Sequence, residues 1–329
     1  MKDEYKKIFW RTGLEITPDT FSQADNYFCA QQNLIRKLLN LQYYGLLPVN
    51  DMAATTMPAS APLGYDTSAS HVNYWATPSL TVSASLNGPV ISIEQLSCNG
   101  VTKEGHLIQF NNDQLTPLRN QRLMITGSMS GCCYVVIRIN SFEHTLVEPV
   151  ENEETPYALP VYELDVKELT QIAGNELPVL KIDTTQNSPK IDLNYIPPCM
   201  AVCSYDKLVE QYSNLKQVVT EIVSVMNGKK SQYQQLLYPV TILLFDLEQF
   251  SLHNPPYYLV QLLKRTIRTI DFFVKHNEWN LTNVIKMPYL HDDISIILKS
   301  LAKCFQDVQQ FIGKATVIKE KEEDFTPRI

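Results

Sequence analysis

The spacing of apolar residues predicts a long helix near the start of the chain. Thr17 is suited to cap free backbone N–H groups, and Pro18 occupies the first helical position, where its missing donor costs little. Apolar residues then recur on one helical face, at Phe21, Ala24, Phe28, Ile35 and Leu38. Gly45 and Pro48 are expected to close this segment, which would make the helix roughly 40 Å long.

From residue 80 the apolar period changes to two, which is typical of half-buried strands. Residues 80–86 alternate, Asn87-Gly88 follows, and residues 90–93 resume, so a β-hairpin is predicted there. Further strands are predicted at residues 122–126, 134–139, 161–166, 177–183 and 191–195. Residues 80–197 therefore indicate an antiparallel β-sandwich or barrel. The stretch 50–78, rich in Ala, Thr, Ser and Pro, is interpreted as a long irregular excursion.

After Tyr195-Ile196-Pro197-Pro198-Cys199 the apolar steps become three and four, and four amphipathic helices are predicted. The first of them carries a seam of coiled-coil spacing, formed by Leu208, Tyr212, Leu215, Val219, Ile222 and Met226. Such a seam is usually core within one chain, and a contact between copies is the alternative. The predicted fold is α+β: residues 1–199 form a β-rich domain with its N-terminal helix, 200–313 a four-helix bundle, and 314–329 a charged tail.

Composition narrows the class of protein. The 329 residues are 44% hydrophobic and 19% charged, which indicates a folded chain, and the net charge of −7 argues against nucleic acid as the main partner. No run of apolar residues is long enough to span a membrane, and the charged start resembles no secretory signal. Seven cysteines in irregular spacing fit a reducing compartment. These features predict a cytoplasmic protein.

Catalytic and metal-binding signatures are not found in the sequence. Gly228-Lys229 lacks the upstream glycine of a phosphate-binding loop, because position 223 is Val223. The segment 127–131 resembles a nucleophile elbow, but its centre is Met129. The six histidines form no pair at metal-ligand spacing. We therefore expect a non-enzyme without cofactor or metal; an enzyme with an unusual site is the remote alternative.

Seven residues near the start of the chain stand at fixed spacing: Trp10, Gly13, Pro18, Phe21, Gln23, Asp25 and Tyr27. This pattern resembles the opening of TssK, the baseplate protein of type VI secretion systems. Thr12 and Asp19-Thr20 depart from it. The resemblance continues at Tyr195, Pro197 and Pro198, and again at residues 253–259; a turn at residues 99–105 is similar more weakly. Together these segments suggest a distant relative of the TssK family.

The resemblance implies a homotrimer with a β shell, similar to the shoulder of siphophage receptor-binding proteins, and a helical neck. It implies that the shell binds the wedge proteins TssF and TssG, and that the neck faces a membrane-anchored complex at the inner face of the inner membrane. Family members continue into a further globular domain that contacts this complex. Since this sequence stops soon after Gly313, we expect a separate protein to make that contact, without direct membrane insertion. The alternative is a phage-tail-like adhesin.

Overall fold

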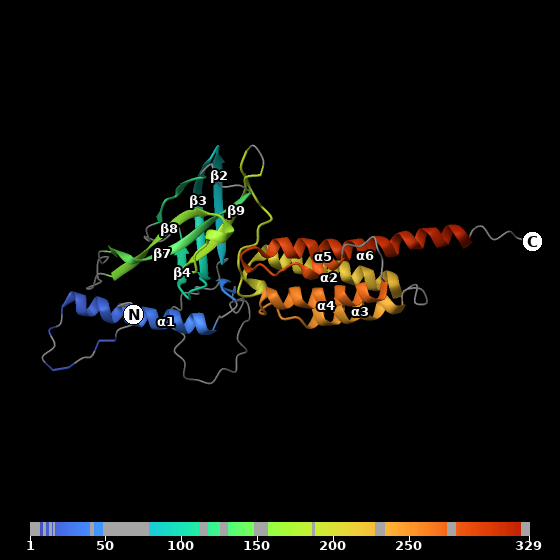
Figure 1. Cartoon of the computed structure of the whole chain (residues 1–329), viewed down its shortest axis with the longest axis horizontal. Helices are drawn as coiled ribbons and strands as arrows, with labels where there is room; N and C mark the ends of the chain where they lie inside the picture. Colours follow the sequence, from blue (N-terminus) through green and yellow to red (C-terminus); the bar gives the residue numbers. More distant parts are fainter. Residues whose placement is uncertain are drawn as a thin grey trace, which may run out of the picture. The chain divides into compact units, whose positions relative to one another are not determined.

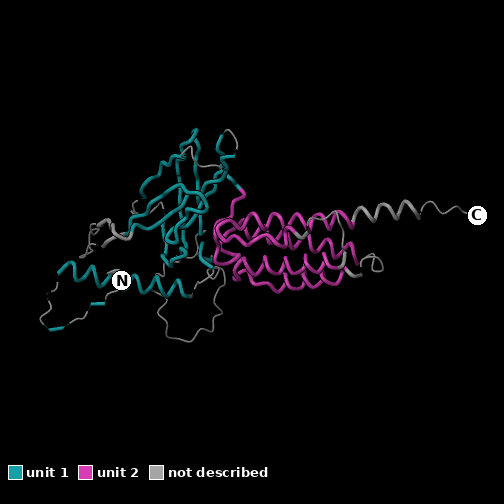
Figure 2. The backbone as a smooth tube through the Cα atoms, in the orientation of Figure 1, with its two compact units in different colours: residues 1–193 teal, residues 194–329 magenta. Residues whose placement is uncertain are grey.

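The computed structural model divides into two compact units, Met1–Leu193 and Asn194–Ile329 (Figure 2). The boundary lies close to the one expected after Cys199. The final strand expected at residues 191–195 is shorter than predicted, because the chain turns at Leu193 and Asn194. The structure describes residues 7–8, 11–12, 15, 17–39, 43–48, 79–111, 118–125, 131–147, 157–185, 188–227, 234–274 and 281–323.

The first unit consists of one α-helix, one short 3-10 helix and ten strands among its described residues. Helix α1 spans Pro18–Leu39 and is shorter than predicted, and Gly45, with φ of 121°, begins a strand. The short helix η3 spans Leu169–Gln171. The strands are β1 (Gly45–Leu46), β2 (Leu80–Asn87), β3 (Val90–Val101), β4 (Leu107–Asn111), β5 (Leu118–Arg119), β6 (Arg122–Met124), β7 (Cys132–Val147), β8 (Tyr157–Lys167), β9 (Glu176–Asp183) and β10 (Lys190–Ile191).

The strands form two five-stranded sheets (Figure 1). In the first, β3 pairs antiparallel with β1, β2, β4 and β6. In the second the order is β10-β9-β7-β8-β5, with β5 parallel to β8. The predicted hairpin is confirmed: Asn87 pairs with Val90, and Gly88 has the positive φ of 59° that the tight turn requires.

The two sheets pack face to face as a sandwich. Phe110 of β4 meets Tyr162 of β8 edge-on, with ring centroids 5.3 Å apart. Gly100 of β3 lies so close to Leu177 of β9 that a Cβ there would sit 2.6 Å from the leucine side chain. The fully buried side chains come from both sheets and include Ile91, Leu96, Ile108, Ile137, Leu164, Leu177 and Ile182. Each contributes about 1.5–3 kcal/mol by leaving water, which makes this core the main stabilising term of the unit.

One tyrosine hydroxyl joins the sheets by hydrogen bonds. The Tyr162 side chain is buried, and its hydroxyl donates to the backbone carbonyl of Gln109 at 2.9 Å. The same oxygen accepts from the backbone N–H of Gln109 at 3.1 Å. Burial raises the pKa of Tyr162, because the ionised form loses hydration. One side chain of the second sheet therefore satisfies both backbone groups of a residue in β4.

The second unit is a helical bundle, as predicted. Its helices are η4 (Val202–Ser204), α2 (Asp206–Asn227), α3 (Gln234–Gln249), α4 (Pro256–Val274), α5 (Leu281–Lys286), η5 (His291–Asp293) and α6 (Ile294–Glu323). The short α5 was not expected. Helix α3 contains Pro239 near its start, where few backbone bonds are lost. Helix α6 passes Gly313 and continues to Glu323, so the expected tail is helical over most of its length; its last residues, Lys319 to Glu323, are good helix formers.

Candidate assembly surfaces

The motif residues near the start of the chain lie on α1 where the structure describes them. Trp10 and Gly13 lie outside the described residues. Pro18 is the first residue of α1, and the Thr17 hydroxyl accepts from the backbone N–H of Thr20 at 3.2 Å, which confirms the predicted cap. The remaining motif positions line the first turns of the helix: Phe21, Gln23 and Asp25 are exposed and Tyr27 is half-buried.

Helix α1 contacts the sandwich at a tight turn between β3 and β4. The Asn33 side-chain amide lies 3.4 Å from His106 Nδ1. Within the turn the N–H of Gly105 donates to the carbonyl of Thr102 at 2.9 Å, and Gly105 has φ of 88°. A Cβ at Gly105 would meet the backbone oxygen of Asn33 at 2.1 Å and the backbone nitrogen of Lys37 at 2.9 Å. Glycine therefore allows the helix backbone to approach the turn closely.

The apolar stripe of α1 points away from that contact. Phe28 is 57% exposed, and Leu34, Ile35 and Leu38 are also exposed. Successive residues of a helix are 100° apart, which places Phe28, Ile35 and Leu38 on the side away from Asn33 and Lys37. The sequence leads to the expectation that Trp10, Phe21 and Tyr27 are buried, either in the sandwich or between copies. Within one chain, burial in the sandwich is wrong for Phe21, which is exposed, because α1 packs on its sandwich through other residues.

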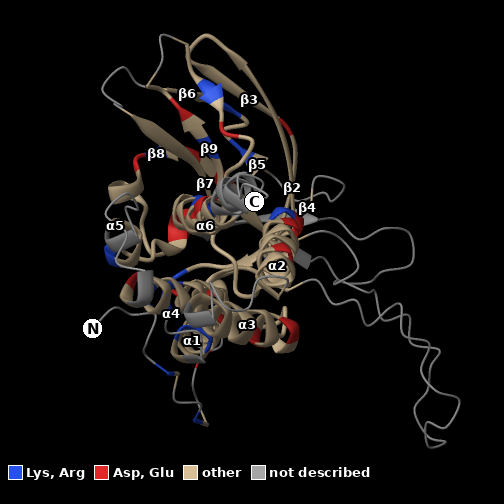
Figure 3. Cartoon of the chain, turned by 90° about the vertical axis from the view of Figure 1, so that its right-hand side faces the viewer, with Lys and Arg blue, Asp and Glu red and all other residues tan. Residues whose placement is uncertain are grey.

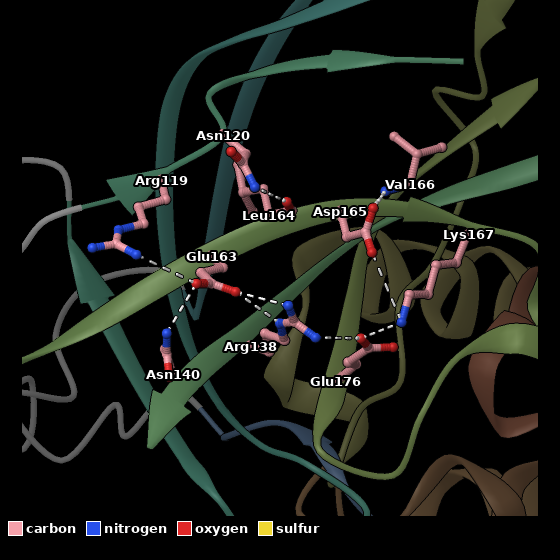
Figure 4. A network of polar contacts seen from close by, with 10 residues as sticks. All are labelled: Arg119, Asn120, Arg138, Asn140, Glu163, Leu164, Asp165, Val166, Lys167 and Glu176. Carbon is pink, nitrogen blue, oxygen red and sulfur yellow. Dashed lines mark hydrogen bonds and ion pairs between the residues drawn. The ribbon is translucent and has the colours of Figure 1, made fainter. Parts of the chain in front are cut away.

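A network of charged side chains joins three strands of the second sheet (Figure 4). Arg138 of β7 stands opposite Glu163 of β8 and Glu176 of β9 in the strand register. Its Nε and terminal nitrogen donate to Glu163 Oε2 at 3.1 and 2.8 Å, and its other terminal nitrogen lies 3.7 Å from Glu176 Oε1. Lys167 Nζ donates to Glu176 Oε1 at 2.5 Å. The Glu176 carboxylate is fully buried and also accepts from the N–H of Ala173 at 2.8 Å.

The network is balanced in charge and in hydrogen bonds. Asn140 donates to the second oxygen of Glu163 at 3.1 Å, and Arg119 lies 4.0 Å from it. The hydrogen bond from Arg138 holds the pKa of Glu163 below its usual range. Asp165 lies 3.9 Å from Lys167, so three carboxylates face three cations. Because each group has a partner of opposite charge, the network fixes the strand register rather than presenting a reactive group.

The segment that follows the first motif of the second unit contacts the start of the second motif, about fifty residues later in the chain. Val202 and Cys203 donate backbone N–H bonds to the carbonyls of Asn254 and Leu252, at 3.0 and 2.9 Å. Cys203 Sγ lies 3.5 Å from His253 Nδ1. Tyr195, Pro197 and Pro198 of the first motif are buried, and the Tyr195 hydroxyl donates to the carbonyl of Asp292 at 2.9 Å.

The predicted seam lies inside the bundle. Leu208, Tyr212, Leu215, Val219, Ile222 and Met226 are all buried within one chain. The Tyr212 hydroxyl donates to the backbone carbonyl of Leu247 in α3. These side chains are therefore occupied by α3 and α6 of the same chain, and a contact between copies would use other residues.

Two features of this protein escaped prediction from the sequence. One is the charged network, although its members alternate along β8 at Glu163, Asp165 and Lys167, which is a detectable signal of one polar sheet face. The other is a set of exposed aromatic residues on α3. Among the described residues no three or more His, Cys, Asp or Glu side chains gather as metal ligands, and no helix there has the length and apolar character to span a membrane.

Known structures share this arrangement of elements. No protein-family model and no curated protein sequence matches the chain. A crystal structure of TssK superposes with a TM-score of 0.59 at 15% identity, over 92% of this chain and 69% of that one. The fold is TssK-like. A cryo-electron microscopy structure of the type VI secretion system TssK–TssF–TssG baseplate subcomplex gives 0.56 at 15% identity, over 92% of this chain and 99% of that one.

The likeness to TssK extends beyond one solved example. A structure of the baseplate complex from the type VI secretion system gives a TM-score of 0.55 at 12% identity, over 92% of this chain and 98% of that one. At such coverage the TssK-like fold includes both the sandwich and the bundle. The helix, sandwich and bundle order expected from the sequence is therefore confirmed.

Proposed function

We propose that this chain is a structural subunit of a type VI secretion baseplate and not an enzyme. In this proposal it is a cytoplasmic homotrimer that links the wedge proteins TssF and TssG to a membrane-anchored complex at the inner face of the inner membrane. The observation that carries the proposal is the likeness, over 92% of the chain, to a chain of the TssK–TssF–TssG subcomplex. A fold alone does not determine function, so the contacts themselves need testing.

The two units supply separate surfaces for such a link. Each has its own core, and each exposes a helix with apolar side chains: α1 in the first unit and α3 in the second. Exposed apolar surface of this extent marks interaction sites on soluble proteins. In the first unit, the exposed large apolar side chains of the described residues gather on α1, apart from Met124 and Leu193. We therefore assign the wedge contact to the first unit, with α1 as the surface to test.

Co-purification tests the wedge contact. The full chain, tagged and co-expressed with TssF and TssG, is expected to retain both at micromolar concentration. Phe28→Lys should weaken that retention because it places a charge on the apolar stripe, while lysine keeps helix propensity. Val225→Lys, an exposed apolar position on α2, is the matched control and should behave as the wild type. Failure of the wild type to retain either protein would refute the proposed function.

Two measurements test the membrane side. Residues 319–324 hold two lysines and four acidic residues, so their net charge is −2, and the roughly 1 kcal/mol that each lysine contributes does not suffice to hold an anionic bilayer. The purified protein should therefore stay at the bottom in flotation with phosphatidylserine vesicles, and flotation with the lipid would contradict this. Deleting residues 314–329 should release membrane-complex proteins and spare TssF and TssG. The reverse result would show that the two ends are assigned the wrong way round.

A further inference from the structure

Strand β2 forms one edge of the first sheet. In the part of the chain that the structure describes it pairs with β3 alone, so its outer edge has no strand beside it. With eight residues it is long for an edge strand, since β4 has five residues, β6 three, and β5 and β10 two each. Edge strands of soluble proteins are usually kept short, or are protected by charged residues or proline.

The edge formed by β2 has neither of these protecting residue types. Its sequence contains no Lys, Arg, Asp or Glu and no proline, so the strand is tan along its whole length in Figure 3. By contrast β8, which β5 covers over only two residues, carries Glu163, Asp165 and Lys167. Charge on β2 itself therefore does not oppose the addition of a further strand.

The hydrogen bonds at both ends of β2 show which of its residues are bonded to β3. At one end Asn87 and Val90 flank a two-residue turn, a position at which the two residues are a hydrogen-bonded pair. At the other end the N–H of Asn99 in β3 donates to the carbonyl of Ser79 at 2.8 Å. Because bonded and non-bonded pairs alternate along antiparallel strands, both ends indicate that the odd-numbered residues of β2 are bonded to β3.

The even-numbered residues of β2 direct their backbone groups to the outer edge. The N–H and C=O groups of Val82, Ala84 and Leu86 point away from β3, and no other strand among the described residues takes them. The side chains of the same three residues share a face with Leu80, which is buried, and are half-buried themselves. An added strand would bond to these groups and would cover these apolar side chains with its own.

We propose that the outer edge of β2 binds an extended segment of another protein, which adds a strand to the first sheet. The open backbone groups recur at every second residue, about 6.8 Å apart, and another extended backbone presents donors and acceptors at that spacing. The segment is apolar at every second residue, where its side chains continue the half-buried row of β2, and polar in between.

The outer face of the sheet beside β2 decides between another protein and a second copy. The Ser83 hydroxyl donates to the carboxylate of Glu94 in β3 at 3.3 Å, so a negative charge lies beside the middle of the edge. A lysine on the outer face of the added strand would complement it, and β2 of a second copy has no such residue. Two identical edges also pair only about a twofold axis, and here the choice rests on the proposed function, which assumes a trimer.

Binding of a designed peptide tests the proposal on the full chain. The probe is the fluorescently labelled peptide Thr-Val-Thr-Val-Lys-Val-Thr-Val-Thr, whose valines would face the sandwich and whose lysine would lie on the side of Glu94. In this register the valine N–H groups bond to β2 and the threonine N–H groups point away from it. N-methylation of the valines should therefore weaken binding by at least about tenfold. The peptide N-methylated at its threonines is the matched control and should bind like the unmodified one.

A variant of the protein gives a second measurement. Ala84→Pro removes one N–H at the edge, and proline is tolerated in an edge strand where the N–H faces away from the sheet. It should weaken peptide binding by about tenfold and leave thermal unfolding unchanged. Ser85→Ala is the matched control, because its backbone groups are bonded to β3, and it should bind like the wild type. If Ala84→Pro does not fold, the two N-methylated peptides still decide the question on the wild type.

Hydrogen exchange locates the bound peptide. In the free protein the amides of Val82, Ala84 and Leu86 should exchange faster than those of Ser83 and Ser85, and the peptide should slow them. The proposal is overturned if these three amides are already protected in the free protein, or if the peptide leaves their exchange unchanged. It is also overturned if the two N-methylated peptides bind alike. Protection in the free protein that disappears on dilution would assign the edge to a second copy instead.

The same samples separate this inference from the proposed function. A protein that binds the peptide at β2 but retains neither TssF nor TssG supports the inference and refutes the function. A protein that retains TssF and TssG while the peptide leaves the amides of β2 unchanged supports the function and refutes the inference.

Discussion

Replacing Gly105 by alanine tests whether α1 is held on the sandwich in the way the structure shows. The added methyl group would stand 2.1 Å from the backbone oxygen of Asn33, where carbon and oxygen atoms normally stay at least 3.3 Å apart. Backbone atoms on both sides cannot swing aside as a side chain does. Helix α1 must therefore move by about 1 Å or detach from the turn at Gly105.

The loss of folding free energy in Gly105→Ala has two parts, and a second variant separates them. At φ of 88° an alanine is strained, which costs about 1–3 kcal/mol. Overpacking against α1 adds about 1–3 kcal/mol. Gly88→Ala is the matched control: its φ of 59° is also positive, and a Cβ there meets no atom within 4 Å. Both variants share the strain and the reduced freedom of the unfolded chain, so their difference isolates the contact with α1.

Limited trypsin digestion and thermal unfolding provide the assay. Arg36 and Lys37 lie in the last turn of α1, beside the turn that holds it. Gly105→Ala should be cut there faster than Gly88→Ala, and its first unit should melt lower by about 2–4 °C for each kcal/mol of difference. Equal digestion and equal melting of the two variants would show that α1 does not rest on this turn.

Three further predictions concern the first unit. Tyr162→Phe should lower its unfolding free energy by about 1–3 kcal/mol in a denaturant titration, because both backbone groups of Gln109 lose their partner; an unchanged midpoint would contradict the bond between the sheets. Lys167→Met should lower the unfolding free energy by about 3–5 kcal/mol, and Arg265→Met, the comparison in the second unit, by at most about 1 kcal/mol. The reason is that only Lys167→Met leaves a buried carboxylate, that of Glu176, without its closest cation. Equal losses of unfolding free energy in the two variants would contradict the argument that the burial of Glu176 makes its ion pair important. Burial raises the pKa of the Cys98 thiol from 9.0 to about 12, so the unfolded chain ionises first and stability falls as pH rises from 9 towards 12, by up to about 1.4 kcal/mol per pH unit. Cys98→Ala should flatten that fall, and an unchanged slope would contradict it.

Local signals predicted the elements that depend on few neighbours. The Asn87-Gly88 turn specifies its own hairpin, and the Thr17 cap specifies where α1 begins, because each needs only adjacent residues. The buried face of α2 was also predicted, because the period of its apolar residues shows which side of the helix is buried. The short strand β5 was missed because its pairing is determined by a distant partner, β8. The strand β4 was missed although it pairs with β3, which directly precedes it in the chain.

The surfaces were harder to predict than the elements. On α1 the periodic apolar residues mark a face correctly, but nothing in the sequence says that small and polar residues would meet the sandwich instead. On α3 the period of Leu236, Val240, Leu243 and Leu247 predicts the inner face correctly. Nothing in the sequence says that the outer side, with Tyr238 and Phe245, would carry exposed aromatic residues as well.

The two bonds between Tyr162 and Gln109 have a consequence for how partners can bind. The outer edge of a strand normally offers free N–H and C=O groups to any extended segment, which would add to the sheet or start aggregation. In β4 a hydroxyl from the opposite sheet already takes both groups of Gln109, and its ring is held against Phe110. An incoming strand would first have to displace a buried side chain. Addition of a further strand, whether from a partner or from a second copy, is thus opposed at the Gln109 position of this edge.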